Sequence, residues 1–502
     1  MQTEPGGEVR GFRQRAVRGS ERPALAALLT LLPLLAIAEN APWYQSDFPP
    51  AEFRARWEKV FEKIGDKAVA LVAGAPPAGG FAFPRQSNDF YYLCGVETPS
   101  SYILLDGRSR RVTLYLPPRN ARLEAAEGKV LSADDRDLVM RLTGADDVQS
   151  TEAMRGDWLA GLPGGAPDAL WTPFAPAEQA AEQRWELLAR NAAIAADSWD
   201  GRLSREARLV ELLRARAAKG QEQRPVNDLT PVLDALRGRK SPREVALIRE
   251  ASRLAGLGLL EAMRCTRPGV FEYELDAAAR YVFLVNGARL EGYRSITAGG
   301  TETIWNMHYY RNSAALKNGD LVLMDYAPDY RYYVSDIARV WPVSGRYSPL
   351  QRELLGFVLE YRNAILKRIR PGVTPRQIQD EAKTAMEPVF ARWRFSKPAY
   401  EAAARKLVDA GGGVFSHPVG MAVHDDGGYA DRELVPGVVF SVDPQMRVPE
   451  EKIYLRFEDV VTVTETGVEN FTSFLPSELS DLERAVKGEG IVQKFPPAPP
   501  GR

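Results

Sequence analysis

The sequence predicts an α+β protein in which a smaller α/β domain precedes a larger domain of helices and antiparallel strands. Its 502 residues exceed the usual length of one domain. Short β-type runs alternate with helical segments in the first third, and helices are followed by strand pairs in the second half. The net charge of −1 provides no basic surface, so we expect no nucleic-acid partner.

The N-terminus has the pattern of an export signal. Arginines at positions 10, 13, 15, 18 and 22 precede the apolar run ALAALLTLLPLLAIA, which ends in Ala36-Ile37-Ala38. A charged start, an apolar run of about 15 residues and a small-residue end are typical of a secretory signal. We therefore expect residues 1–38 to be a signal peptide cleaved after Ala38, and the mature protein to be exported, periplasmic or secreted, with no membrane span. An uncleaved N-terminal anchor is the alternative.

Beyond this signal the composition divides the chain into three parts and a tail. Residues 39–176 alternate a helical segment with β-type runs such as KAVALVAGA and RVTLYLPP, and form the α/β domain. Residues 177–235 are rich in Ala, Glu, Arg and Leu, which predicts a helical connector. In residues 236–485, the second domain, we expect an antiparallel sheet with helices on one side. Residues 486–502 form a proline-rich tail, whose end KFPPAPPGR is expected to be unfolded.

Absent motifs and scarce cysteines argue against several enzyme classes. The sequence contains no H-E-x-x-H, no G-x-S-x-G elbow, no Walker loop and no G-x-G-x-x-G. This disfavours serine and cysteine hydrolases, nucleotide enzymes and dinucleotide oxidoreductases. Cys94 and Cys265 are too few for a disulfide framework and have no partner at metal-ligand spacing. We expect both to be buried apolar side chains, with one disulfide between them as the alternative.

The second domain carries pairs of acids in two predicted hairpins. In GDLVLMDYAPDYRYYVSDIARVWPV, Asp325 and Asp336 flank the turn formers Pro328 and Asp329, and their midpoint falls at 330.5, on the turn. A hairpin symmetric about that turn would place the two aspartates directly opposite each other, with Cβ atoms about 5 Å apart.

Asp443 and Glu458 form a similar pair, because their midpoint of 450.5 falls inside the predicted turn VPEEK. Like charges opposed on apolar strands destabilise a sheet, so four such acids need a hard cation or hold protons at raised pKa. Carboxylates with a little imidazole suit Mn, Fe(II), Co or Zn. Four carboxylates and one histidine suffice for two bridged ions about 3.5–4 Å apart. The alternative is that each acid is an ordinary solvent-facing strand residue.

Histidine is scarce, with three in the chain. His417 and His424 lie together in GGGVFSHPVGMAVHDDGG, and His308 lies earlier, in IWNMHYYRNS. Their crowding indicates one shared site. The alternative is that they are buried histidines of the core.

These motifs resemble a known family. The order Asp, Asp eleven residues later, His, an acid in a V-x-P strand and Glu in an R-x-E-D strand is similar to that of the pita-bread metallopeptidases, with aminopeptidase P and prolidase the nearest in pattern. FPRQSNDFYYLCG, LRGRKSPREVALIREA and YLRFEDVVTVTETGVENFT extend the resemblance over roughly residues 50–480. It implies a pita-bread catalytic domain behind a creatinase-like α/β domain.

The resemblance also implies a metal site. Two divalent ions, manganese first with zinc, cobalt or iron as alternatives, would be bound by Asp325, Asp336, His417, Asp443 and Glu458. Asp336 and Glu458 would each contact both ions, and Asp443 would also act as the general base.

Three further residues and the substrate follow from the same resemblance. His308 and His424 would bind the substrate and the developing oxyanion, and Arg456 would hold a ligand carboxylate in place. The substrates would be short peptides with proline in second position, cut after the first residue, or dipeptides as in prolidase. The protein would be a homo-oligomer, dimeric or tetrameric.

Two positions depart from the family pattern. The family has Glu at the position of Asp443, and the loss of about 1.5 Å of reach can cost on the order of 10²-fold in rate. It also has a histidine at the position of Gly413, four residues before His417. A non-peptidase member of the fold, either a metal-dependent lyase acting on a sulfonium compound or a metal-free creatine amidinohydrolase, and a non-catalytic scaffold are therefore the alternatives.

Overall fold

The computed structural model describes residues 43–79, 82–156, 158–219, 222–409, 417–425 and 429–497. The chain separates into two units, residues 1–42 and 43–502. The predicted signal peptide, with its cleavage after Ala38, and Gly413 lie outside the described residues. Among the helices that are described, none combines the length and the apolarity needed to cross a bilayer.

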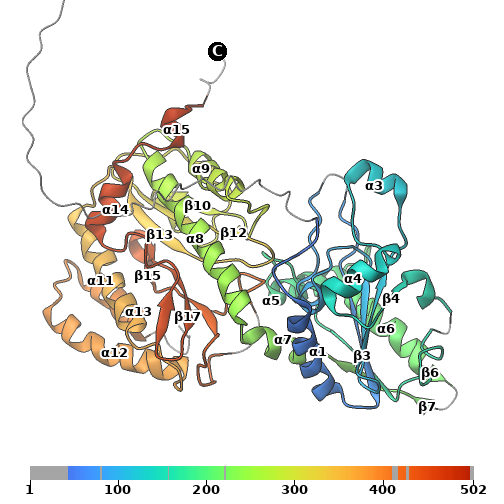
Figure 1. The fold of residues 1–502 in the computed structure, drawn as a ribbon. Coiled ribbons are helices and arrows are strands. Elements are labelled where there is room, and N and C mark those ends of the chain that lie inside the picture. The colour runs from blue at the N-terminus through green and yellow to red at the C-terminus, as the bar shows by residue number, and fades with distance from the viewer. Residues whose placement is uncertain are drawn as a thin grey trace, which may run out of the picture. The chain divides into compact units, whose positions relative to one another are not determined.

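A six-stranded sheet with the order β4-β3-β2-β1-β5-β8 forms the N-terminal domain (Figure 1). The central strands β1, β2 and β3 pair antiparallel, and the outer strands are added in parallel. Strand β8 comes from the segment in which the composition predicts a helical connector, so that segment also supplies one edge of the sheet. The strands are β1 (Ala68–Ala73), β2 (Tyr102–Asp106), β3 (Arg111–Leu116), β4 (Asp147–Ser150), β5 (Ala169–Thr172) and β8 (Val226–Asp228).

The helices of this part pack through apolar faces. The first of them, α1 (Pro50–Ile64), buries Phe53, Trp57, Val60 and Phe61, at the i, i+4 and i+7 spacing of an amphipathic helix. A short pair, β6 (Ala218–Lys219) and β7 (Glu222–Gln223), follows α6. The remaining helices are α2 (Asn88–Cys94), α3 (Ala121–Glu127), α4 (Arg136–Thr143), α5 (Arg184–Ala196), α6 (Arg205–Ala217) and α7 (Thr230–Gly238).

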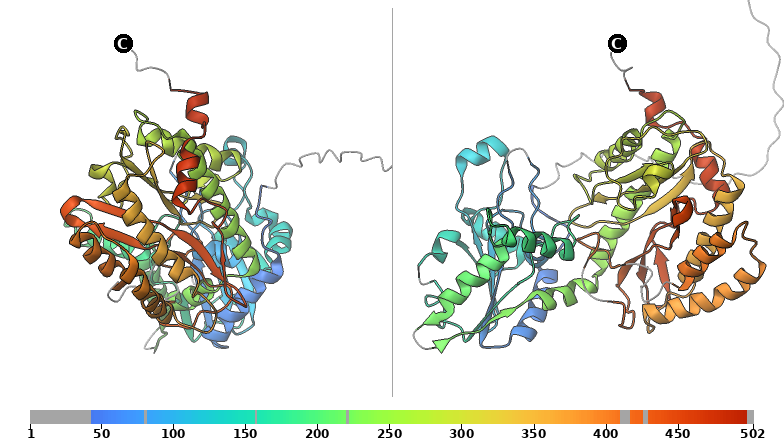
Figure 2. Two further views of the ribbon diagram at one scale, coloured as in Figure 1. Left: turned by 90° about the vertical axis from the view of Figure 1, so that its left-hand side faces the viewer. Right: turned by 180° about the vertical axis from the view of Figure 1, so that it is seen from behind.

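The second domain begins with the long helix α8 (Pro242–Cys265). Pro242 occupies its first turn, and Ser241 and Glu244 form a reciprocal capping box that satisfies two backbone N–H groups. Its strands lie between α8 and α9 on one side and α11 to α13 on the other (Figures 1 and 2). The further helices are α9 (Glu272–Val285), α10 (Thr301–Ile304), α11 (Pro349–Leu366), α12 (Pro375–Arg392), α13 (Pro398–Asp409), α14 (Leu479–Val486) and α15 (Ile491–Lys494).

The strands of the second domain form several small antiparallel sheets. Two sheets have three strands, with the orders β10-β11-β13 and β14-β17-β18, and the pairs β12-β9 and β15-β16 continue them. A bridge between Ala338 and Glu458 joins the two larger sheets. The strands are β9 (Leu290–Glu291), β10 (Ile296–Gly299), β11 (Leu321–Asp325), β12 (Pro328–Asp329), β13 (Ala338–Pro342), β14 (Val439–Val442), β15 (Gln445–Val448), β16 (Ile453–Arg456), β17 (Asp459–Val463) and β18 (Val468–Asn470).

The two cysteines are separate. Cys94 ends α2 and Cys265 ends α8, and both thiols are free and buried. Burial raises the pKa of the Cys94 thiol to about 12. Both side chains are therefore small apolar residues of the core, as predicted, and the alternative of a disulfide between them is wrong.

Candidate metal centre

The first pair of acids comes from β11 and from the segment before β13. Asp325 is the last residue of β11, and Asp336 lies two residues before β13. The Tyr293 hydroxyl lies 2.5 Å from Asp325 Oδ1 and 3.0 Å from Asp336 Oδ1. A hydroxyl has one proton to donate, so it can satisfy one of the two carboxylates at a time.

The prediction that Asp325 and Asp336 lie directly opposite each other is wrong. Asp325 pairs with Ala338, so Asp336 lies diagonally across the ladder. The turn is centred one residue later than predicted, at 331.5, because Arg331 and Tyr332 take positive φ values of 53° and 73°, as a type I′ turn requires. The resulting shift of two residues keeps both side chains on one face of the sheet. The two acids therefore still converge.

The second hairpin has the predicted register. Val442 pairs with Asp459 in the ladder of β14 and β17, and Gln445 pairs with Arg456 in the ladder of β15 and β16. Both ladders are symmetric about position 450.5, which places Asp443 directly opposite Glu458 in the short gap between them. The β-bridge between Glu458 and Ala338 brings this pair close to the first pair of acids. In it, the Glu458 N–H donates to the Ala338 carbonyl at 3.0 Å.

Arg456 is the cation of this cluster. It donates to both oxygens of Asp443, at 3.1 and 2.9 Å. It also donates to Asp325 Oδ2 at 2.7 Å and to Glu458 Oε2 at 2.5 Å. Its side chain is 6% exposed. One guanidinium thus faces the four acids Asp325, Asp336, Asp443 and Glu458, which we call the site acids, and cannot balance their charge.

Burial and the excess of negative charge raise the pKa of two site acids, Asp336 and Glu458. Burial raises the pKa of Asp336 well above its usual range, and Asp325 and Asp443 raise it further against the opposing effect of Arg456. Burial likewise raises the pKa of Glu458, with Arg456 opposing and Asp336 adding to the shift. The Glu458 Oε1 atom is buried and has no hydrogen-bond partner among the described residues. A carboxylate oxygen in this position calls for a proton or a cation.

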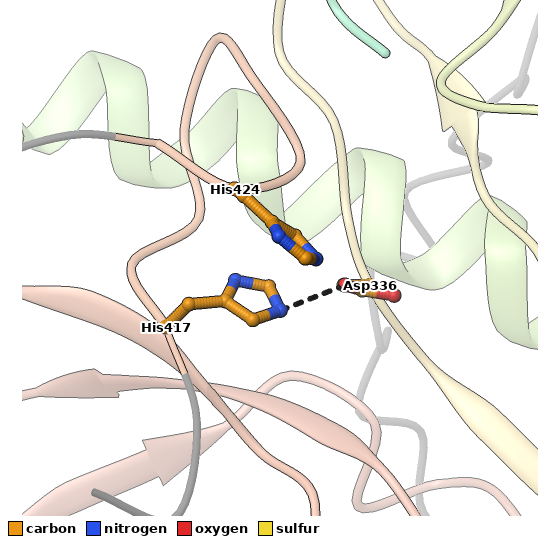
Figure 3. A group of neighbouring side chains, drawn as sticks. All are labelled: Asp336, His417 and His424. Carbon is orange, nitrogen blue, oxygen red and sulfur yellow. Dashed lines mark ion pairs between the residues drawn. The ribbon is translucent and has the colours of Figure 1, made fainter. Parts of the chain in front are cut away.

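Two histidines stand beside Asp336 (Figure 3). His417 Nε2 lies 3.2 Å from Asp336 Oδ2, and the rings of His417 and His424 are 3.7 Å apart at their centroids. His417 Nδ1 lies 3.0 Å from the Pro418 carbonyl, which can only accept, so this contact assigns the proton to Nδ1. The Nε2 lone pair then points toward a carboxylate, which is the arrangement of two ligands around a cation.

These side chains form two groups with metal-ligand spacing. Asp325, Asp336 and Glu458 form one group, and Asp336, His417 and His424 form the other; within each group the ligand atoms lie within 4.8 Å of one another. Asp336 belongs to both groups. The donor set, carboxylates with imidazole, fits hard or borderline divalent ions, and the shared aspartate fits two ions side by side.

Besides Arg456, two predicted site residues lie outside these groups. Asp443 Oδ2 accepts from Arg456 and from the Gln445 amide, and Oδ1 accepts from Arg456 and keeps one lone pair. His308 is exposed, on the segment after α10. Burial first, and then His417 and His308, lower the pKa of His424 to about 2.

Sequence spacing does not indicate every residue of the site. Tyr293 contacts both aspartates from 32 positions before Asp325, and no spacing rule connects it with them. Gln445 could have been found, because it follows Asp443 by two residues and therefore lies on the same face. The Tyr454 hydroxyl donates to Gln445 Oε1 at 2.8 Å, which holds that amide toward Asp443.

Comparisons with known proteins agree with this geometry. Residues 246–465 match the model of metallopeptidase family M24, and residues 53–164 match the aminopeptidase P N-terminal domain. The Xaa-Pro aminopeptidase of Escherichia coli (strain K12) is 28% identical over 467 residues, which cover 87% of this chain and 98% of that protein. The mitochondrial intermediate cleaving peptidase 55 of Arabidopsis thaliana is 27% identical over 448 residues, 86% of this chain and 82% of that protein.

Solved structures agree as well. Zinc-substituted E. coli aminopeptidase P in complex with product superposes with a TM-score of 0.71 at 26% identity, covering 88% of this chain and 99% of that chain. The same enzyme with the inhibitor Pro-Leu gives a TM-score of 0.70, also at 26% identity and with the same coverage. The predicted fold class is thereby confirmed, and candidate ligand groups for the dinuclear metal site of the family are present. The chain belongs to metallopeptidase family M24 and has an aminopeptidase P N-terminal domain followed by a pita-bread catalytic domain.

Proposed function

We propose that this protein is a dinuclear-metal aminopeptidase that hydrolyses the bond between an N-terminal residue and proline in short peptides. The observation that carries the proposal is the sharing of Asp336 between two ligand groups, since two adjacent ions are the arrangement used in metal-assisted peptide hydrolysis. We propose Asp325, Asp336, His417, Asp443 and Glu458 as ligands, with manganese as the first candidate and zinc, cobalt and iron as the others.

The chain's own residues would position and move the proton. Two bound divalent ions supply Lewis acidity and lower the pKa of water. Asp443 takes the proton of the attacking water and passes it to the leaving amine. Arg456, which grips both oxygens of Asp443, fixes the orientation of that carboxylate between the two transfers. Because the same guanidinium holds Asp325 and Glu458, it also keeps these acids in register with the base.

His424 and His308 would contact the substrate. The pKa of His424 is lowered to about 2, chiefly by burial, so its imidazole is neutral at pH 7. A neutral imidazole has one N–H to donate and one lone pair, and donation to the oxygen that gains charge stabilises the transition state. His308, which is exposed, is proposed to contact the substrate.

The first test is metal content followed by cleavage. Protein expressed without residues 1–38 and loaded with Mn is expected to bind two ions per chain and to release the first residue from an Xaa-Pro-Xaa peptide. An otherwise identical peptide with alanine in place of proline is the matched control. No bound metal would refute the proposal, and faster cleavage of the alanine peptide would refute the proline preference.

The second test concerns the base. Asp443→Asn keeps the size of the side chain and removes the proton acceptor, so turnover should be lost while one or both ions stay bound. Unchanged turnover would refute the assignment. Asp443→Glu adds a methylene, and a rate increase of up to about 10²-fold would measure what the shorter acid costs this enzyme.

Export and assembly are further parts of the proposal. We propose that residues 1–38 direct export and are removed after Ala38, which N-terminal sequencing of the mature protein would test. We also propose a homodimer or homotetramer, and light scattering of the purified protein would give its mass. A monomer mass would refute the assembly.

A further inference from the structure

We propose that Arg237 and Lys240 are positioning residues for His424, acting through the carboxylate of Asp425. Arg237 lies in the last turn of α7, and Lys240 lies just before the cap of α8. His424 and Asp425 are neighbours in sequence, so the orientation of one constrains the other. The inference deepens the proposed function and rests on it, because it concerns how the same site is held in shape.

The Asp425 carboxylate is held by two buried cations. Arg237 Nη2 donates to Asp425 Oδ1, and Lys240 Nζ donates to Asp425 Oδ2 at 3.1 Å. The side chains of Arg237, Lys240 and Asp425 are 2%, 1% and 1% exposed. Ion pairs without access to water are screened little and keep a fixed geometry. The carboxylate also rests on the backbone of Gly420, where a Cβ atom would come within 2.0 Å of Oδ2.

Arg237 is itself anchored on the N-terminal side of the chain. Its guanidinium donates to Asp89 Oδ1 at 2.9 Å and to Glu178 Oε2 at 3.2 Å. Glu178 in turn accepts from Arg184 Nε at 2.5 Å. Arg237 has partners in α2 and in the segment before α5, so its position does not depend on Asp425. It therefore provides a fixed ion-pair partner that determines where the Asp425 carboxylate lies.

The two histidines of the loop depend on different supports. At the His417 end the loop is attached to strand β14, since Ser441 N–H donates to the His417 carbonyl at 3.0 Å and Val419 N–H donates to the Val439 carbonyl at 3.2 Å. At the His424 end Val423 N–H donates to the Ala180 carbonyl at 2.9 Å, in the first part of the chain, and Asp425 N–H donates to the Pro418 carbonyl at 3.0 Å, beside His417.

It follows that a change at Arg237 should move His424 more than His417, which the bonds to β14 hold in place. The contact between the two rings, which are tilted by 35° with centroids 3.7 Å apart, is sensitive to such a movement. A displacement of about 1 Å at a reacting group can cost on the order of 10²-fold in rate. Among the residues that the structure describes, Arg237 and Lys240 are linked to the site through Asp425, so they position the site and take no part in the reaction.

The experiment uses the scarcity of histidine. With ¹³C-labelled histidine, the full mature chain free of metal should give three imidazole signals, which His308→Asn and His424→Asn assign. We expect Arg237→Met and Asp425→Asn to shift or broaden the His424 signal while the His308 signal stays unchanged. Arg56→Met is the matched control, because Arg56 is a buried arginine, 6% exposed, whose hydrogen bonds run to Tyr92 and Glu52.

Activity provides the second readout. In the Mn-loaded enzyme, Arg237→Met should lower kcat by about 10–10²-fold with little change in KM, and Arg237→Lys should recover part of the loss. The double variant with Asp425→Asn should be no worse than either single change, because the residues act as one unit. Should Arg237→Met fail to fold, Lys240→Met, which leaves the Arg237 contact intact, is expected to give a smaller shift of the same signal.

The outcomes separate this proposal from the proposed function. An unchanged His424 signal in folded Arg237→Met, or an equal shift in Arg56→Met, would overturn the positioning role whatever the activity. A shifted His424 signal in an enzyme that cleaves no peptide would support the positioning role and overturn the proposed function.

Discussion

Glu458 and Asp459 are adjacent acids, both fully buried, and they behave in opposite ways. Burial disfavours ionisation of both. At Asp459 the guanidiniums of Arg339 and Arg362 outweigh burial and lower the pKa, with hydrogen bonds of 2.7 and 2.5 Å. At Glu458 burial prevails over Arg456, and its pKa is raised. The difference comes from the two faces of one strand, because successive side chains point to opposite sides.

The comparison separates structural from functional burial of charge. On one face a single carboxylate meets two arginines, and its hydrogen bonds are completed by the Thr472 hydroxyl. On the other face four acids share one arginine, and one carboxylate oxygen has no partner among the residues that the structure describes. A fold gains nothing from such an unbalanced cluster by itself, and strongly shifted, unbalanced acids of this kind are typical of functional sites.

The largest effect is expected on activity, from Glu458→Gln. The substitution keeps the shape of the side chain and removes a charge that the proposed ions would contact, so we expect activity to fall by more than about 10³-fold and metal binding to weaken. Metal-free protein should melt at the same or a higher temperature, because a neutral amide avoids the cost of burying an ionised carboxylate beside the other site acids. Metal titration followed by differential scanning fluorimetry would measure both. A large loss of metal-free stability would break the contrast with Asp459.

Asp459→Asn should show the reverse pattern. It leaves Arg339 and Arg362 buried without their acid, and removing one partner of a buried pair costs about 3–5 kcal/mol. Urea unfolding of the metal-free protein would measure this loss. At a temperature where the variant is folded, metal content should equal that of the wild type. Loss of metal with little loss of stability would mean that the two faces are not separate.

The two hairpins differ in how well the sequence predicts their register. Asp443 and Glu458 are opposed as predicted because residues 449–452 form the turn expected in VPEEK, although the sequence does not indicate the φ of 50° at Lys452. In the other hairpin Pro328 and Asp329, which are favourable turn residues, pair with β9 instead. The turn falls on Arg331 and Tyr332, and non-glycine residues adopt positive φ too seldom for this to be predicted. Tertiary pairing thus overrode the local preference.

The candidate site was predictable where its residues repeat a pattern, and not where they come from elsewhere in the chain. The acids on strands and the histidines in one loop can be recognised from the intervals between them in the sequence. Tyr293 and Arg237 contact the site or its loop from distant segments, and only the fold brings them there. The N-terminal domain shows the same limit, because β8 joins its sheet from a segment with helical composition.

A smaller effect is expected from Tyr293→Phe. The hydroxyl lies between Asp325 and Asp336, and loss of an outer partner of metal ligands typically costs about 10–100-fold in metal affinity. Isothermal titration with Mn would measure it. Tyr347→Phe is the control, because it removes another buried hydroxyl, which donates to the Val340 carbonyl at 2.7 Å. Equal affinities in the two variants would mean that Tyr293 does not support the site.

The smallest expected effect is a dependence of metal-free stability on pH. The folded pKa of Glu458 is raised above the value of about 4.3 of an unfolded chain. The folded state therefore holds its proton more tightly, and the stability from this group is present below about pH 4.3 and is lost as pH rises through the folded pKa. Asp459 has a lowered pKa, so its contribution stays constant in this range and is lost only in stronger acid.

Subtracting the variant isolates this group from His424, which also titrates differently in the two states. In EDTA, the free energy of unfolding of the wild type minus that of Glu458→Gln should fall as pH rises from 5 to 8. With saturating Mn the difference should be positive and should grow with pH, because cations bind the ionised ligand. A difference that stays constant in EDTA would mean that the face with four acids is as well balanced as the face of Asp459, and the contrast between the two neighbours would then be lost.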